Sequence, residues 1–229
     1  MPSALVTGGS SGIGFAIARM LRDEGYDVTV ASRTQEKVEA AAAELGALAV
    51  TANMGSEDDC VRVVAEHRGR FGGMDVLVNS AGLGIAGTVD GLQTKHIDLQ
   101  LGVHLRGLLL VTREAIPLLR ESKGWVFNLA SIAGTAPTPG LTVYGATKAA
   151  VIALTRSQNA ELDGAGVRAV AICPGFVDTA MAEWSGLAAE EMITPDDCAE
   201  VVRMCLRLSP NARIPQVVIE RLGAGNLID

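Results

Sequence analysis

The chain has 229 residues, a length that fits one large domain with a substantial core and no need of stabilising disulfides. Its formal net charge is −7 at pH 7 and it contains no run of lysines and arginines, which argues against a nucleic-acid partner. Apolar residues make up 48% of the chain but aromatic residues only 3%, a composition typical of parallel strands covered by helices.

Several kinds of segment are missing from the sequence. No apolar run is long enough to span a membrane, and no basic stretch followed by an apolar one marks a secretion signal, so we expect a cytoplasmic protein without membrane contact. The four cysteines (Cys60, Cys173, Cys198 and Cys205) form no CxxC pair and have no histidine at metal spacing. We therefore expect buried thiols and no metal site.

Short apolar runs alternate with helix-length segments along the whole chain. The expected strands are Ala4–Thr7, Asp27–Ala31, Ala47–Thr51, Val76–Asn79, Trp125–Leu129, Arg168–Cys173 and Gln216–Ile219. The expected helices are residues 13–24, 35–45, 56–71, 95–121, 143–163 and 195–208. Ser56 and Thr194, each followed by acidic residues, look like helix caps. The alternation predicts an α/β fold: a doubly wound, Rossmann-type parallel sheet of about seven strands with helices on both faces, in a single domain over residues 1–229.

A glycine-rich loop, Thr7-Gly-Gly-Ser-Ser-Gly-Ile-Gly14, follows the first strand and opens a helix. Its glycines would permit a tight turn, close approach of the backbone to a pyrophosphate, and close packing of helix on strand. Amide groups at the helix N-terminus would then bind the phosphates. A glycine cluster alone can be a structural turn, but this position between strand and helix indicates a dinucleotide site. The expected contacts are Gly8, Ser10, Ser11, Gly12, Ile13 and Gly14.

The end of the second strand, Ala31-Ser32-Arg33-Thr34, bears on which dinucleotide binds. An NAD site usually has an acidic residue about 20 positions after the glycines, which holds the 2′-hydroxyl. No carboxylate stands at this tip, and Asp27 lies at the opposite end of the strand. Arg33 could pair with a 2′-phosphate, with Ser32 and Thr34 as hydrogen-bond donors, although a solvated arginine is the alternative. These residues favour NADP over NAD.

Tyr144 and Lys148 lie four positions apart in Tyr-Gly-Ala-Thr-Lys, and Ser131 lies thirteen positions before the tyrosine. On a helix, residues at this spacing project from one face. The ammonium group would favour the phenolate and lower the pKa of Tyr144. The serine hydroxyl could hold a carbonyl oxygen while the phenol protonates it. Taken alone, the pair could equally be a chance arrangement on a surface helix.

Together, these motifs resemble the short-chain dehydrogenase/reductase family, in its compact single-domain branch. Asn79-Ser-Ala-Gly82 follows the fourth strand, as the family's Asn-Asn-Ala-Gly motif does, and Pro174-Gly175-Phe-Val-Asp-Thr179 follows the sixth, as its Pro-Gly segment does. The resemblance runs in order from about residue 3 to 220. It implies an NADP(H)-dependent carbonyl reductase or alcohol dehydrogenase that acts on a small-molecule carbonyl or alcohol.

The resemblance also implies a role for each matching residue. Ser131 would orient and polarise the carbonyl, Tyr144 would exchange its proton, and Lys148 would hold the nicotinamide ribose and lower the pKa of the tyrosine. Asn53 stands where the family usually carries an aspartate that contacts adenine. The cofactor contacts implied beyond the glycine loop and strand tip are Asn53, Met54, Asn79, Ala81, Gly82, Tyr144, Lys148, Pro174, Gly175, Val177 and Thr179.

His104 is a departure from the family pattern. The fourth catalytic residue of the family is an asparagine in an Asn-x-x-Gly segment, and its carbonyl holds a water that relays protons to the lysine. The corresponding segment here is Val103-His104-Leu-Arg-Gly107. An imidazole could support the relay with altered pH dependence, impair it, or be wholly structural. The other histidines, His67 and His96, are expected to be solvated.

Three segments should build the substrate pocket: Leu83–Gly87, Ile132–Leu141 and the residues after Gly175. Their side chains predict an apolar or mildly polar ligand, since charges are few. The apolar members are Leu83, Ile85, Ile132, Pro137, Leu141, Phe176, Met181 and Trp184. Only the residues between Thr179 and Thr194 could form a lid, which is short for the family.

The resemblance further predicts a homodimer or homotetramer, since helices 95–121 and 143–163 match those through which the family usually assembles. The chain lacks the family's common Asp-Gly-Gly ending, which puts the tetramer contacts made by such a tail in doubt. A second function stays open beside the enzyme: a cofactor-binding sensor or partner-binding protein that kept the fold and lost efficient chemistry. The set Ser131, Tyr144 and Lys148 favours the enzyme, and His104 favours the alternative.

Overall fold

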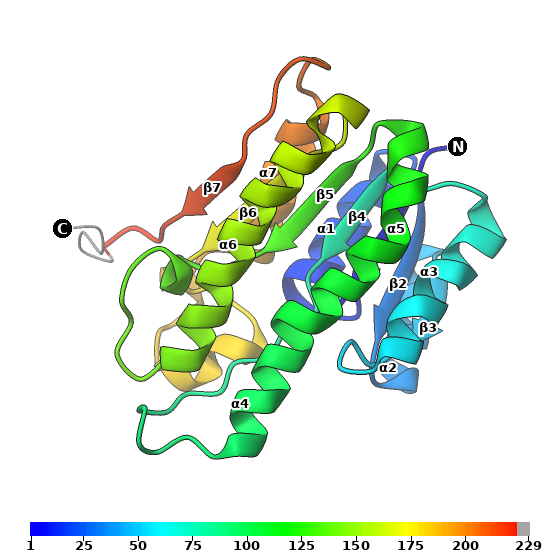
Figure 1. The fold of residues 1–229 in the computed structure, drawn as a ribbon. Helices are drawn as coiled ribbons and strands as arrows, with labels where there is room; N and C mark the ends of the chain where they lie inside the picture. Colours follow the sequence, from blue (N-terminus) through cyan, green and yellow to red (C-terminus); the bar gives the residue numbers. More distant parts are fainter. Residues whose placement is uncertain (224–229) are drawn as a thin grey trace.

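Seven parallel strands form the centre of the computed structural model, which describes residues 1–223 (Figure 1). The strands are β1 (Ser3–Thr7), β2 (Asp27–Ser32), β3 (Leu48–Thr51), β4 (Val76–Asn79), β5 (Trp125–Leu129), β6 (Arg168–Pro174) and β7 (Gln216–Ile219). Each expected strand is confirmed to within one residue at either end. The order across the sheet is β3-β2-β1-β4-β5-β6-β7, so the connections reverse direction between β1 and β4. Ligands of doubly wound sheets bind at such a point, beyond the carboxyl ends of the strands.

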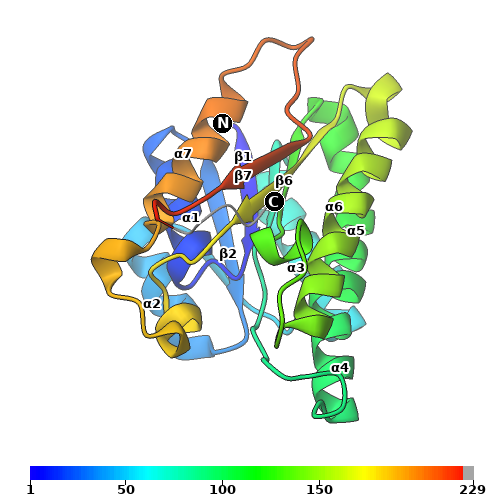
Figure 2. The same cartoon turned by 90° about the vertical axis from the view of Figure 1, so that its left-hand side faces the viewer.

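Helices cover both faces of the sheet, as predicted (Figure 2). On one face lie α1 (Gly12–Asp23), α2 (Gln35–Leu45) and α7 (Pro195–Leu206), and on the other lie α3 (Glu57–Phe71), α5 (Leu108–Ser122) and α6 (Thr142–Leu162). Alternate residues of each strand contribute to the two cores, because successive side chains of a strand point to opposite faces of the sheet. In β1, for example, Ala4 and Val6 pack against the first group of helices and Leu5 packs against the second.

The helix expected at residues 95–121 is interrupted, and in this respect the prediction is wrong. Helix α4 (Thr94–Leu101) leads into a π-helical stretch over Gly102–Gly107, and α5 begins only at Leu108. The wider turn occurs where the chain passes close to the loop after β3. A Cβ atom at Gly107 would lie 2.0 Å from the carbonyl oxygen of Met54, so only glycine fits there. Such π-helical turns often mark functional sites.

His67 is fully buried, which corrects the expectation of a solvated side chain. Its ring contacts the Thr29 hydroxyl (2.8 Å) and the Gly73 carbonyl oxygen (3.1 Å). The sequence around it looked polar, but Cys60, Val63, Val64 and His67 recur at helical spacing and form the inward face of α3. Ser56 caps this helix as expected, since its hydroxyl accepts a hydrogen bond from the Asp59 amide (3.4 Å).

The four cysteines are buried and free, as expected. Residues 1–223 contain no cluster of histidine, cysteine, aspartate and glutamate side chains that could hold a metal ion. Across the same residues, no helix combines the length and apolar character needed to cross a membrane.

A buried polar network ties α6 to the centre of the sheet. The Asn128 amide nitrogen on β5 donates to the Thr155 hydroxyl and to the Gln158 side-chain oxygen, both at 2.9 Å and both on α6. The Asn128 oxygen accepts from Asn79 on β4 at 2.9 Å. Because buried polar groups are costly unless they are paired, this network fixes how α6 sits on the sheet. The residues on α6 that face the carboxyl ends of the strands are thereby held in place.

Candidate active site

A nucleotide groove with a volume of about 280 Å³ lies across the carboxyl ends of β1, β2, β3 and β4. The loops that follow these four strands supply most of its lining. Nearly all the predicted cofactor contacts on these loops lie along it, as does Thr179. They are Gly8, Ser10, Ser11, Gly12, Ile13, Gly14, Ser32, Arg33, Thr34, Asn53, Met54, Ala81 and Gly82. The groove thus gathers residues from Gly8 to Thr179 that were identified separately in the sequence.

The glycine loop has the tight backbone that its sequence predicts. Gly8 and Gly12 have φ angles of +69° and +53°, in the left-handed region that favours glycine. A Cβ atom at Gly14 would lie 2.3 Å from the Gly8 carbonyl oxygen. The loop therefore closes on itself and leads directly into α1, whose first turn presents unpaired backbone amides to the groove. These features fit the phosphates of a dinucleotide.

The end of the groove beside α2 is cationic. Arg33 and Lys37 line it, both exposed, and among residues 1–223 no aspartate or glutamate lines any part of the groove. The Ser32 hydroxyl is directed at the Thr34 carbonyl oxygen, at 3.5 Å. Lys37 was not predicted as a cofactor contact, because it lies beyond the tip of the strand. Its position in the first turn of α2, four residues after Arg33, was the available signal.

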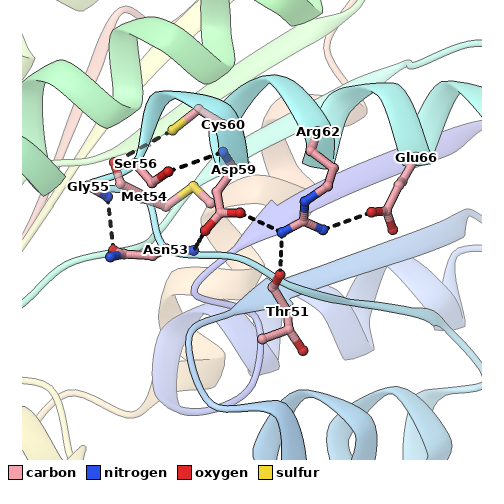
Figure 3. A network of polar contacts seen from close by, with 9 residues as sticks. All are labelled: Thr51, Asn53, Met54, Gly55, Ser56, Asp59, Cys60, Arg62 and Glu66. Atoms are coloured by element: carbon pink, nitrogen blue, oxygen red, sulfur yellow. Dashed lines mark hydrogen bonds and ion pairs between the residues drawn. The ribbon is translucent and has the colours of Figure 1, made fainter.

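A network of ionic and polar contacts supports the opposite wall of the groove (Figure 3). The Asp59 carboxylate accepts a hydrogen bond from the backbone amide of Asn53 (2.8 Å) and another from the Arg62 guanidinium (2.6 Å). Arg62 also donates to the Thr51 carbonyl oxygen (2.7 Å) and pairs with Glu66 (2.8 Å). The Asn53 amide and the Arg62 side chain hold the pKa of Asp59 below its usual value. The network holds the turn after β3 against α3, so that Asn53 and Met54 stand along the groove.

A second cavity, the substrate pocket, has a volume of about 310 Å³ and adjoins the groove. The two cavities share Ile13, Ser80, Gly82, Leu83, Thr179 and Met181. Seven of the eight apolar residues expected there line it: Leu83, Ile132, Pro137, Leu141, Phe176, Met181 and Trp184. Ile85 does not, and its assignment is wrong. Its neighbours Gly84 and Ala86 face the cavity, so the alternation of an extended chain turns Ile85 away.

Ser131, Tyr144 and Lys148 line the pocket where it meets the groove. Two glycines allow the loop after β5 to pack directly on α6 and so bring Ser131 to Tyr144. A Cβ atom at Gly134 would lie 2.6 Å from the Lys148 carbonyl carbon, and one at Gly145 would lie 2.8 Å from the Ala133 carbonyl oxygen. The Ser131 hydroxyl accepts a hydrogen bond from the Ala133 amide (3.2 Å) and remains beside the cavity.

The pKa of Tyr144 differs from the lowered value that the sequence predicted. The pKa of Tyr144 is raised above its usual value, because the effect of burial exceeds the opposing effect of a hydrogen bond with the Ser131 hydroxyl. Lys148 donates to the Leu129 carbonyl oxygen (2.7 Å), and its Nζ lies 5.5 Å from the centre of the Tyr144 ring. Burial lowers the pKa of Lys148 to about 8. In this arrangement Tyr144 is a neutral phenol, able to donate a proton, and the ammonium group lies beneath it.

His104 is buried beside this set, and both of its ring nitrogens have partners. The Thr147 hydroxyl donates to the Tyr144 carbonyl oxygen (2.7 Å), so at 2.8 Å from His104 Nδ1 it accepts the imidazole proton. Nε2 then accepts from the Leu83 amide (3.1 Å). Burial and the charge of Lys148 lower the pKa of His104 to about 3. Protonation would also set an N–H against the Leu83 N–H, so the geometry independently favours the neutral ring.

Asn79, predicted as a cofactor contact, is not among the residues that line the groove. Its side-chain nitrogen donates to Thr112 (3.1 Å) and Asn128 (2.9 Å). As the last residue of β4 it faces α5, and only the residues after it turn toward the groove. Pro174, Gly175 and Val177 line the substrate pocket instead of the groove.

Comparisons with known proteins match this architecture. The family model described as short chain dehydrogenase covers residues 2–188. An uncharacterized oxidoreductase of Staphylococcus epidermidis is 35% identical over 222 residues, which cover 94% of this chain and 95% of that protein. The alcohol dehydrogenase of the archaeon Thermococcus sibiricus, solved with 5-hydroxy-NADP, is similar with a TM-score of 0.91 and 28% identity over 97% of both chains. A 3-ketoacyl-(acyl-carrier-protein) reductase from Brucella melitensis, solved with NADH, has a TM-score of 0.86 and 29% identity over 96% of both chains.

Proposed function

The chain belongs to the short-chain dehydrogenase family and is an oxidoreductase of that type, and we propose that it is an NADP(H)-dependent carbonyl reductase or alcohol dehydrogenase. The substrate is a small, mostly apolar carbonyl compound or the corresponding alcohol. One observation carries this proposal: Ser131, Tyr144 and Lys148 lie where the apolar pocket opens into the nucleotide groove. A hydride acceptor in the pocket would thus lie between the nicotinamide end of the groove and a proton donor.

The nicotinamide cofactor supplies or accepts the hydride when it is bound, and the protein supplies position and a proton. In the direction of reduction, the Ser131 hydroxyl donates a hydrogen bond to the substrate carbonyl oxygen. The Tyr144 phenol then gives its proton to that oxygen as negative charge develops. Lys148 carries its charge below about pH 8 and stabilises the phenolate that remains. Lys148 also holds the nicotinamide ribose in this proposal.

The preference for NADP(H) rests on Arg33 and Lys37. A guanidinium and an ammonium group at one end of the groove, with no carboxylate along it, suit a 2′-phosphate and leave a 2′-hydroxyl without an acidic partner. The similar solved structures contain 5-hydroxy-NADP in one case and NADH in the other, so the choice depends on these two side chains.

His104 acts in this proposal by holding parts of the site together rather than by moving protons. Through Leu83 it binds the loop after β4, and through Thr147 it binds the first turns of α6. These two elements carry the groove wall and the catalytic tyrosine. With both nitrogens occupied, the ring has no free position for a relay water. This favours a wholly structural role for His104 over a role in proton relay.

The deciding experiment measures oxidation of NADPH and of NADH against a panel of neutral aldehydes, ketones, quinones and hydroxy-steroids. We expect turnover of one or more neutral carbonyl compounds, with NADPH preferred. Tight binding of NADPH without turnover of any compound would instead favour a cofactor-binding sensor. A clear preference for NADH would overturn the role given to Arg33 and Lys37.

The assembly and location of the protein stay predictions. Leu101 and Leu109, on α4 and α5, are 42% and 45% exposed, which supports a homodimer or homotetramer formed through these helices. Sedimentation velocity of the purified chain tests the assembly. The cytoplasmic location rests on the sequence alone.

A further inference from the structure

The loops that line the substrate pocket carry acidic residues and no basic ones. Three loops surround the cavity: residues 80–93, 130–141 and 175–193. Together they contain no lysine or arginine. They carry five exposed acidic side chains, Asp90, Asp178, Glu183, Glu190 and Glu191. Within the described part of the chain, Lys148 is the one cationic residue in the pocket lining, and it is buried and bonded to the Leu129 carbonyl oxygen.

Four of these acids belong to one closed loop over the pocket. The Asp178 amide donates to the Ile193 carbonyl oxygen, and the Ile193 amide donates to the Phe176 carbonyl oxygen, both at 2.9 Å. The chain between these residues therefore leaves the sheet and returns to the same place. Within it, Met181, Ala182 and Trp184 line the cavity.

Glu183 lies between Ala182 and Trp184 in the chain, and its side chain is exposed and outside the cavity lining. Across residues 1–223, its carboxylate forms no ion pair. Exposed carboxyl groups are ionised at neutral pH.

We propose that this acidic rim makes the pocket select its substrate by charge. It admits neutral apolar carbonyl compounds and those with an ammonium group, and it rejects anionic ones. Carboxylates and acyl groups carried on phosphate-bearing carriers such as coenzyme A fall in the rejected class. The inference rests on the proposed carbonyl or alcohol chemistry and narrows its substrate class.

The physical argument has two parts. An anion entering the pocket would approach several carboxylates and then lose its hydration against apolar walls, with no cation placed to compensate it. A cationic or neutral group meets no such cost. An ammonium group also gains from the carboxylates and from the aromatic pair Phe176 and Trp184, whose ring centres lie 5.8 Å apart at the cavity wall.

The nucleotide groove has the opposite charge, since Arg33 and Lys37 line it and no acid does. The two adjoining cavities therefore separate a phosphate-bearing cofactor from an uncharged or cationic substrate. Such steering between exposed charges weakens as salt is added.

The test uses benzaldehydes that carry a para methyl, carboxylate or trimethylammonium group, with NADPH as cofactor. We expect kcat/KM for the carboxylate to be at least about ten-fold below that of the other two, through a higher KM, and the gap to narrow at high salt. Equal kcat/KM values for the three compounds would overturn the proposal.

A charge-reversal pair locates the effect. Glu183→Lys should raise kcat/KM for the carboxylate relative to the methyl compound. Glu121→Lys makes the same change in net charge on an exposed residue near the far end of α5, away from the pocket, and should leave the ratio unchanged (Figure 1). Equal shifts in the two variants would show a general charge effect and contradict a role for the rim.

A binding experiment keeps this inference separate from the proposed chemistry. Trp184 lines the pocket and is 60% exposed, so its fluorescence should report occupancy by the corresponding benzyl alcohols, whereas Trp125 is buried in the core. Trp184→Phe is the control that should remove the signal. Weaker binding of the carboxylate than of the other two alcohols supports the acidic rim even if no aldehyde is turned over. A complete lack of turnover would contradict only the proposed function. Equal binding of the carboxylate defeats the rim alone.

Discussion

The nucleotide groove and the substrate pocket adjoin each other but are built in different ways. The backbone shapes the groove: glycines at positive φ form its floor, and the Asp59–Arg62 network holds the turn that carries Asn53. Side chains shape the pocket, and they come from three loops that are far apart in the sequence. A site made by the backbone therefore leaves a pattern in the sequence, whereas a site made by side chains becomes visible only when its loops are placed.

Tyr144 lines the pocket but not the groove, so the largest expected effect tests whether the two cavities act independently. Tyr144→Phe removes the proton donor and keeps the ring, and we expect kcat to fall about 1,000-fold, within the range for loss of a general acid. The Kd for NADPH should change little, because the groove is intact. Stopped-flow turnover and fluorescence titration of NADPH measure the two quantities.

Ser131→Ala is the matched change on the pocket side and should also lower kcat without weakening NADPH binding. Undiminished turnover in Tyr144→Phe would refute the mechanism. A parallel loss of cofactor affinity would mean that the groove and the pocket are not independent.

The difference between the cavities also explains what could be predicted from the sequence. The order of strands and helices followed from apolar runs, and the glycine loop, Arg33 and Tyr144 stood in recognisable local patterns. Ile85 was assigned wrongly because the direction of a loop side chain depends on backbone geometry that composition does not encode. His67 was assigned wrongly because its polar neighbours hid the inward stripe of α3. The partners of His104 depend on contacts between elements, which local patterns do not specify, whereas Lys37 had a local signal in the first turn of α2.

The next largest effect concerns two buried neutral histidines at opposite ends of the sheet. His67 packs against Ser3 at the amino end of β1, and His104 lies beside the site at the carboxyl ends of the strands. Burial lowers their pKa values to about 4 and about 3, from 6.5 in the unfolded chain. Between pH 6.5 and 4 the unfolded state therefore binds more protons than the folded state, so the free energy of unfolding falls as the pH is lowered through this window. His67 alone should account for a loss of about 3 kcal/mol.

Urea denaturation across this pH window measures the loss. His67→Gln should give a flatter dependence of stability on pH, and His96→Gln, a change at a half-buried residue of α4, serves as the control. If the His67 variant shows the same slope as the unmodified protein, another group causes the acid sensitivity.

A smaller effect tests the cationic end of the groove. Replacement of Arg33 and Lys37 by alanine should weaken NADPH binding about 10- to 100-fold, because charge-assisted hydrogen bonds contribute roughly 1.5–3 kcal/mol. Binding of NADH, which lacks the 2′-phosphate, should change little. Titration of both cofactors measures the ratio, and Arg120→Ala, a change at an exposed residue of α5, is the control. Equal weakening of both cofactors would mean that the pair does not read the 2′ position.

The smallest expected effect lies at the boundary between the two cavities, where His104 joins the loop after β4 to α6. His104→Leu leaves the Leu83 amide and the Thr147 hydroxyl without their partner, and we expect kcat to fall about ten-fold, as for an unpaired buried polar group. Thr147→Val removes one of the same two contacts and should show a smaller loss.

His104→Asn distinguishes position from proton transfer, because an amide can replace the contacts but cannot titrate. We expect kcat close to that of the unmodified protein and an unchanged pH–rate profile, since burial lowers the pKa of His104 to about 3, far below the working range. An inflection near neutral pH that disappears in this variant would assign a proton-relay role to the imidazole. Recovery by asparagine but not by leucine would show that the two cavities depend on a hydrogen-bonded bridge at this position.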